Sequence, residues 1–77
     1  MPSAPPPDWV IARRRAIGDA IREARLRRNL TQERLAELAG LDRLAINRIE
    51  MGHQSPILDN VIRVAAALDT PLADLVR

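Results

Sequence analysis

The sequence contains no cysteine, no lysine, no tyrosine and no phenylalanine, and Trp9 is its only aromatic residue. Without cysteine the chain can form neither disulfide bonds nor thiolate metal sites, and a reducing compartment is its natural setting. Because aromatics are scarce, a core must be built from Leu, Ile, Val and Ala, which suits close-packed helices better than a sheet. A chain of 77 residues makes one domain at most.

Long hydrophobic runs are absent as well. No run approaches the roughly 20 apolar residues that span a bilayer. The first residues, "MPSAPPP", lack the charged-then-apolar pattern of a secretory signal. We therefore expect a cytoplasmic protein with no membrane partner.

The charge balance is only weakly informative, since the net charge is +2. All 12 basic residues are arginine, whose planar guanidinium can bind phosphate or guanine through two hydrogen bonds. A GC-rich genome also favours codons for Arg, Ala and Pro, and it explains the same bias. The arginines are compatible with DNA binding without establishing it.

Hydrophobic spacing and capping residues predict an all-α chain. Residues 1–7 are rich in proline and predict an extended arm, followed by one domain over residues 8–77. In the fourth helix we expect Val61, Ile62, Ala65 and Leu68 to point inward. The predicted helices run from Trp9, with Asp8 as N-cap, to about Arg28, then over 32–39, 43–51 and 58–68, with a short last helix behind a Thr70 cap and Pro71.

The stretch "TQERLAELAGLDRLAINRIEMG", residues 31–52, predicts two short helices joined by a tight turn. Thr31 and Asp42 are suited to cap their N-termini, and Gly40 and Gly52 to close their C-termini. Helices of about eight residues are unstable alone and form by packing on neighbours. Two helices joined this closely cross steeply, so the second can protrude while the first supports it.

The second of these helices is two-sided at 100° per residue. One side is apolar and is predicted to be buried: Ala45, Ile46 and Ile49. The opposite side carries Leu44, Asn47, Arg48 and Met51, with Arg43 at its edge. Guanidinium, amide and apolar groups are those that read guanine, adenine and the thymine methyl group in a major groove.

From about residue 17 to residue 76 the sequence resembles the Cro/C1-type (XRE family) helix-turn-helix transcriptional regulators. The marks are "IREAR", "LTQERLAELAGL", "INRIEMG", "SP" and "VIRVAAAL", in this order. The resemblance implies a compact five-helix bundle of the lambda-repressor-like DNA-binding type. It also implies a sequence-specific regulator of double-stranded DNA, expected to act as a repressor and as a homodimer on an inverted repeat. Such a protein works in the bacterial cytoplasm, on the nucleoid when bound, and needs no cofactor.

The resemblance also assigns roles to residues. Base or groove contacts fall to Arg43, Leu44, Asn47 and Arg48. Phosphate contacts fall to Thr31 and Gln32, and we also expect them at Met51 and His53. Arg25 and Glu50 are expected to form an ion pair inside the fold. The sequence departs from the family at Asp42, where serine is common, and at Leu44 and Ala45, where small hydroxyl residues are common.

The sequence leaves three alternatives open. Trp9 either covers the core or anchors a partner, together with Leu72, Leu75 and Val76, which are candidate dimer contacts. The same fold also suits an antitoxin-like module that binds a partner protein first and DNA second. The run "RRR" at 13–15 is either a solvated face or a contact to the DNA backbone. Catalysis is not expected, because no nucleophile–base set, metal-ligand cluster or glycine-rich phosphate loop is evident.

Overall fold

The computed structural model describes residues 4–53 and 55–77, and these form five helices with no strand among them. The all-α prediction is thereby confirmed for this part of the chain. The helices are α1 (Asp8–Arg27), α2 (Gln32–Ala39), α3 (Arg43–Met51), α4 (Leu58–Ala67) and α5 (Leu72–Leu75). Residues 4–7 are exposed and belong to no helix, and the part of the predicted arm over 1–3 lies outside the described residues. No described helix combines the length and the apolar character needed to cross a lipid bilayer.

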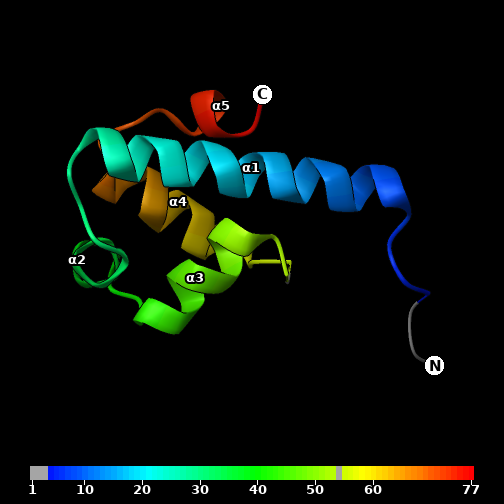
Figure 1. Ribbon diagram of the computed structural model, residues 1–77, viewed down its shortest axis with the longest axis horizontal. Helices are drawn as coiled ribbons and strands as arrows, with labels where there is room; N and C mark the ends of the chain where they lie inside the picture. The colour runs from blue at the N-terminus through cyan, green and yellow to red at the C-terminus, as the bar shows by residue number, and fades with distance from the viewer. Residues whose placement is uncertain (1–3, 54) are drawn as a thin grey trace.

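The long helix α1 runs across the whole molecule, and α3 and α5 pack against it, whereas α2 packs on α3 and α4 (Figure 1). In this view α5 lies above α1 and α3 lies below it, while α2 is seen end-on below the C-terminal end of α1. The first turns of α1 extend past the other helices. The outer part of α1 is therefore left without a neighbour on most sides.

The core is aliphatic, as the scarcity of aromatics predicts. Each of the four longer helices, or its cap, supplies a fully buried side chain: Ile21, Leu35, Ile46, Val64 and Leu68. Trp9 is 70% exposed. Of its two interpretations, covering the core is wrong.

The ends of α2 and α3 form as the sequence predicts. The hydroxyl of Thr31 accepts a hydrogen bond from the backbone N–H of Arg34 at 3.0 Å. The carboxylate of Asp42 accepts one from the backbone N–H of Ala45 at 2.7 Å. Gly40 and Gly52 close the two helices in the left-handed conformation, with φ of 71° and 68°. Side chains with a Cβ are disfavoured there, which is why glycine marks both ends.

Two predicted caps are wrong. Asp8 is the first helical residue rather than the cap; Pro7 precedes it, and no side chain caps α1. Asp8 still lies in the first turn, where a carboxylate stabilises the positive end of the helix dipole. The hydroxyl of Thr70 donates to the carbonyl of Leu68 at 3.1 Å instead of capping α5, which begins after Pro71. In both places proline fixes the entry of the helix by its own restricted φ.

The prediction that Ile62 of α4 points into the core is also wrong. Ile62 is 47% exposed, whereas Val64 is fully buried. The buried stripe follows the spacing of Val61, Val64, Ala65 and Leu68, which keeps to one helix face. Ile62 is one step, about 100°, away from Val61 and leaves that face.

Candidate nucleic-acid interface

The outward face of α3 is close to that predicted. Arg43, Leu44, Arg48 and Met51 are exposed and Asn47 is half-buried. The apolar members, Leu44 and Met51, are 54% and 53% exposed, although burial would favour both. On the inner side Ile46 and Ile49 are buried as predicted, but Ala45 is only half-buried. A helix of nine residues thus offers two guanidinium groups, one amide and two apolar side chains to solvent.

Gly18 lets α1 approach the C-terminal end of α3 at backbone distance. A Cβ at this position would lie 2.5 Å from the carbonyl oxygen of Ile49 and 2.6 Å from that of Glu50. Only glycine allows such an approach without moving one of the helices. Sequence reasoning missed this contact, and its signal was a glycine in the middle of an otherwise unbroken helical pattern.

Two arginines of the run at 13–15, in α1, donate hydrogen bonds to backbone carbonyl groups of the same chain. Arg14 Nε donates to the carbonyl of Gly52, the residue that ends α3, at 3.0 Å. Arg13 Nη2 donates to the carbonyl of Val76, behind α5, at 3.1 Å. Arg15 packs directly against Gly52, because a Cβ added to Gly52 would lie 2.8 Å from the Cγ of Arg15. The run therefore fastens α3 and α5 to α1 and is more than a solvated face.

The structure brings Arg25 of α1 and Glu50 of α3 together. Arg25 Nε lies 2.7 Å from Glu50 Oε2 and Nη2 lies 3.0 Å from Oε1, so the guanidinium binds the carboxylate at two points. Arg25 Nη1 also donates to the carbonyl of Leu30 at 2.8 Å. The two side chains are only 9% and 1% exposed. A pair this buried depends on its full set of hydrogen bonds, because either partner alone would be an uncompensated charge.

The side chain of Gln32 at the start of α2 is turned toward α3. Its Nε2 donates to Glu50 Oε1 at 3.2 Å, and its Oε1 accepts from Asn47 Nδ2 at 3.4 Å. The neighbouring Thr31 is exposed, with its hydroxyl oxygen engaged in the α2 cap. These links were not visible in the sequence, because they join residues 15 and 18 positions apart.

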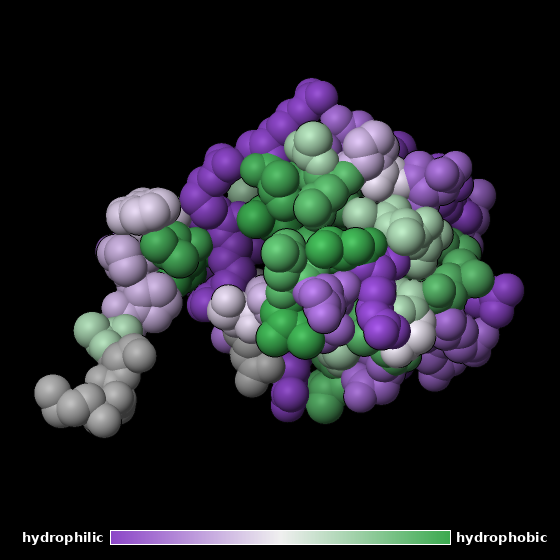
Figure 2. Space-filling model, turned by 180° about the vertical axis from the view of Figure 1, so that it is seen from behind, coloured by the Kyte–Doolittle hydropathy of each residue, from purple (hydrophilic) through white to green (hydrophobic). Residues whose placement is uncertain are grey.

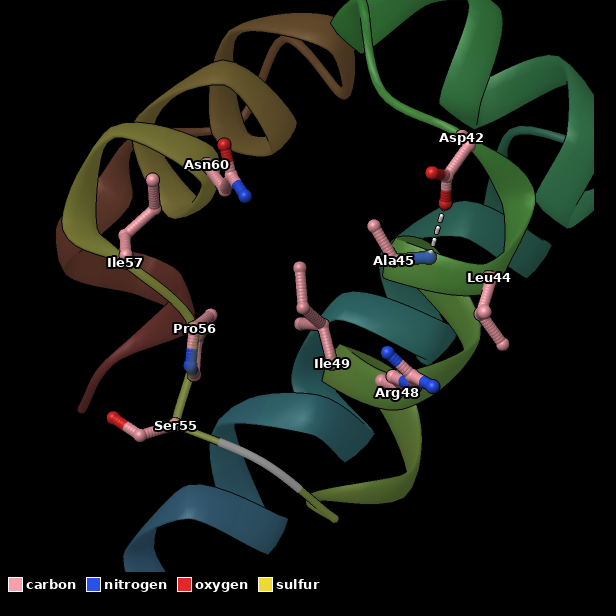
Figure 3. A pocket seen from close by; sticks show the side chains of 9 residues that line it. All are labelled: Asp42, Leu44, Ala45, Arg48, Ile49, Ser55, Pro56, Ile57 and Asn60. Carbon is pink, nitrogen blue, oxygen red and sulfur yellow. Dashed lines mark hydrogen bonds between the residues drawn. The ribbon is translucent and has the colours of Figure 1, made fainter.

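A shallow pocket of about 280 Å³ lies between α3 and the chain that enters α4 (Figure 3). Leu44, Arg48 and Ile49 stand on the α3 side, and Pro56 and Ile57 stand opposite. This volume is at the lower limit of ordinary small-molecule sites. The pocket is a shallow depression along the edge of α3.

The remaining predicted contact residues lie at two other places. His53 is exposed just beyond α3. Leu72 is half-buried against the core and Val76 is 37% exposed. Leu75, proposed as a partner contact, is 3% exposed and is part of the core instead. Its burial follows from α5 folding back onto α1 and α4.

Comparison with known proteins agrees with this geometry. The family model described as "Helix-turn-helix" matches residues 21–75. Among solved structures, the chain is similar to the restriction-modification controller protein C.AhdI from Aeromonas hydrophila, with 38% identity over 83% of this chain and 97% of that chain and a TM-score of 0.80. A search of curated proteins found no match.

Two further solved structures have the same fold. The clp gene regulator ClgR from Corynebacterium glutamicum is 27% identical over 82% of both chains, with a TM-score of 0.76. A hypothetical transcription factor, NHTF, from Neisseria is 27% identical over 100% of this chain and 86% of that chain, with a TM-score of 0.81. The chain belongs to the Cro/C1-type (XRE) helix-turn-helix family and is a DNA-binding transcriptional regulator.

Proposed function

We propose that the protein is a sequence-specific regulator that inserts α3 into the major groove of double-stranded DNA. The observation that carries this proposal is the outward face of α3, where Arg43, Leu44, Asn47 and Arg48 stand together while the inner face is fastened to α1 and α2. Arginine matches the two acceptors of guanine, asparagine matches adenine, and an apolar side chain suits the thymine methyl group. A rigidly seated helix holds these groups in register with the bases.

The residues around α3 suit contact with the phosphate backbone. Thr31 and Gln32 begin α2 beside Arg43, and all three line one open depression. Met51 and His53 lie exposed at the other end of α3. We assign these four flanking residues to the two backbones of the groove. Such contacts fix the position of the protein and carry no sequence information themselves.

We propose that two copies bind an inverted repeat. An apolar groove of about 480 Å³ runs between the first half of α1, the start of α4 and α5, lined by Val10, Ile17, Leu58, Val61, Leu72 and Val76. Hydrophobic side chains also gather in the middle of the face seen in Figure 2, and Ile57 and Leu58 are each 64% exposed. A second copy would bury this surface. In a symmetric dimer the two α3 helices would enter major grooves about 34 Å apart.

We propose that the protein represses transcription. We place it in the bacterial cytoplasm, and on the nucleoid when it is bound to DNA. The similarity to a restriction-modification controller protein and to a clp gene regulator favours control of gene expression. We propose no catalytic activity and no cofactor for the described residues.

An alternative function rests on Trp9. This side chain is 70% exposed on the protruding end of α1. Tryptophan is enriched among residues that dominate protein interfaces. In an antitoxin-like module, Trp9 would anchor a partner protein and DNA binding would be secondary.

Selection of duplexes from a random DNA pool tests the proposal, at about 150 mM salt, where non-specific attraction is weakened. Wild-type protein should enrich an inverted repeat. Arg43→Ala should lose about 1–3 kcal/mol of binding free energy and relax the preference at one base pair. Arg27→Ala is the control, because Arg27 is exposed and lies nine residues, about 180° of helix rotation, from Gly18 on α1. Enrichment of no sequence by folded protein would favour the partner-binding module.

A further inference from the structure

Asn47 on the outward face of α3 is joined to the core by a continuous series of hydrogen bonds. Its Nδ2 donates to Gln32 Oε1 at 3.4 Å, and Gln32 Nε2 donates to Glu50 Oε1 at 3.2 Å. Glu50 is held in turn by two hydrogen bonds from Arg25. Three helices, α1, α2 and α3, contribute to this series.

The chemistry of the groups dictates the direction of each bond. An ionised carboxylate only accepts hydrogen bonds, so Glu50 requires Gln32 to turn its NH₂ group inward. The carbonyl oxygen of Gln32 must then point the other way, where it can only accept. Asn47 therefore has to present its own NH₂ group to Gln32. The orientation of both amides follows from the buried ion pair, because a flip of either amide would place two acceptors or two donors against each other.

We propose that Gln32 is a positioning residue that fixes the polarity of Asn47 toward DNA. With one N–H used by Gln32, Asn47 is left with its second N–H and with Oδ1 as an acceptor. A base edge that places a donor beside an acceptor matches this pair, and in the major groove that base is adenine. This inference rests on the proposed reading of DNA by α3 and names the base that Asn47 selects.

The arrangement has an energetic consequence for specificity. A free asparagine amide rotates and offers either end to a base, so it discriminates poorly between donors and acceptors. Fixing the amide before DNA arrives makes the wrong base leave a polar group unpaired, which is costly in a desolvated interface. The buried end of the series supplies the fixing, since the Glu50 side chain is 1% exposed. Supporting residues of this kind hold contact groups at the surface in productive geometry.

The test replaces Gln32 by methionine, which keeps the length of the side chain and removes its hydrogen bonds. Gln32→Ala is made alongside, so that the result does not depend on how methionine packs. In DNA-free protein, the NMR signals of the Asn47 side-chain NH₂ should shift toward those of a solvated asparagine in both variants. In duplex selection, the preference for adenine at the position that Asn47→Ala relaxes should fall about twofold to tenfold, the effect of one hydrogen bond.

A double variant, Gln32→Met with Asn47→Ala, should show no preference change beyond that of Asn47→Ala alone. The inference is overturned if the Asn47 signals stay in place, or if Gln32→Met weakens binding to all duplexes equally and leaves the preference for adenine unchanged, which is the behaviour of a phosphate contact alone. The NMR result separates this inference from the proposed function, because it needs no DNA. Wild-type protein that enriches no sequence overturns the proposed function, and unmoved Asn47 signals beside a selected repeat overturn only the role of Gln32.

Discussion

The helix-turn-helix pair, α2 and α3, differs from the other three helices in how its ends are made. Both α2 and α3 begin with a side-chain cap and end at a left-handed glycine. By contrast, α1, α4 and α5 begin without a side-chain cap. The chain leaves α1 and α4 through left-handed Asn29 and Asp69, with φ of 57° and 50°. Asn and Asp are the residues other than glycine that tolerate this conformation best.

The difference shows which parts of the fold are specified locally. The residues that cap and close α2 and α3 lie within three positions of each helix end. The start and end of both helices are therefore fixed by local sequence. The other helices are set by what they pack against, such as the contact of Gly18 with the carbonyls of Ile49 and Glu50. Yet α3 depends on both kinds of information, because its caps are local and its seat on α1 is not. The variants below separate the two contributions.

Loss of the buried ion pair should have the largest effect. Arg25→Ala leaves the Glu50 carboxylate buried without its guanidinium, which costs about 3–5 kcal/mol of unfolding free energy. For a domain of this size, thermal unfolding should occur at least about 12 °C lower. The control is Arg28→Ala, which removes an exposed pair with Asp69 at 3.8 Å and should cost about 0–1 kcal/mol. Equal melting temperatures for Arg25→Ala and wild type would contradict a structural role for the pair.

Gly18→Ala should come next and should have opposite signs in two contexts. In an isolated peptide of residues 8–27, alanine raises helicity, because it is favoured over glycine by about 1 kcal/mol. In the whole chain the added methyl group meets the carbonyls of Ile49 and Glu50 and should cost about 1–3 kcal/mol. Circular dichroism of the peptide and chemical denaturation of the chain measure the two effects. A stabilised whole chain would show that the two helices separate easily.

Much of the fold follows from local sequence, whereas the interior of the site does not. The caps at Thr31 and Asp42, the glycine ends and the outward face of α3 depend on spacing that a single helix reveals. The caps predicted at Asp8 and Thr70 are wrong, because a capping residue next to proline looks the same in the sequence whether or not its side chain reaches a backbone N–H. The prediction of Leu75 as a partner contact is wrong, because the packing of a four-residue helix is decided by its neighbours.

The links to Gln32 show the limit more clearly. Its partners Asn47 and Glu50 lie on another helix, and the sequence alone offers no distance between them. Resemblance to the family supplied the pairing of Arg25 with Glu50, and spacing would not have supplied it. Only the structure shows the hydrogen bonds by which Gln32 joins that pair to Asn47. The role of Gln32 in reading DNA remains a prediction.

The smallest expected effects come from the helix caps and test whether local signals contribute on their own. Thr31→Ala removes the acceptor for the N–H of Arg34 and should cost about 0.5–2 kcal/mol. Asp8→Asn removes a first-turn charge that makes no cap hydrogen bond, and it should cost about 0.3–1 kcal/mol at low salt. Denaturation in about 1 M salt should abolish the Asp8 effect, since charge–dipole attraction is screened, and should leave most of the Thr31 effect. If both effects vanished in salt, the Thr31 cap would contribute nothing as a hydrogen bond, and α2 would be specified by packing in the same way as α1.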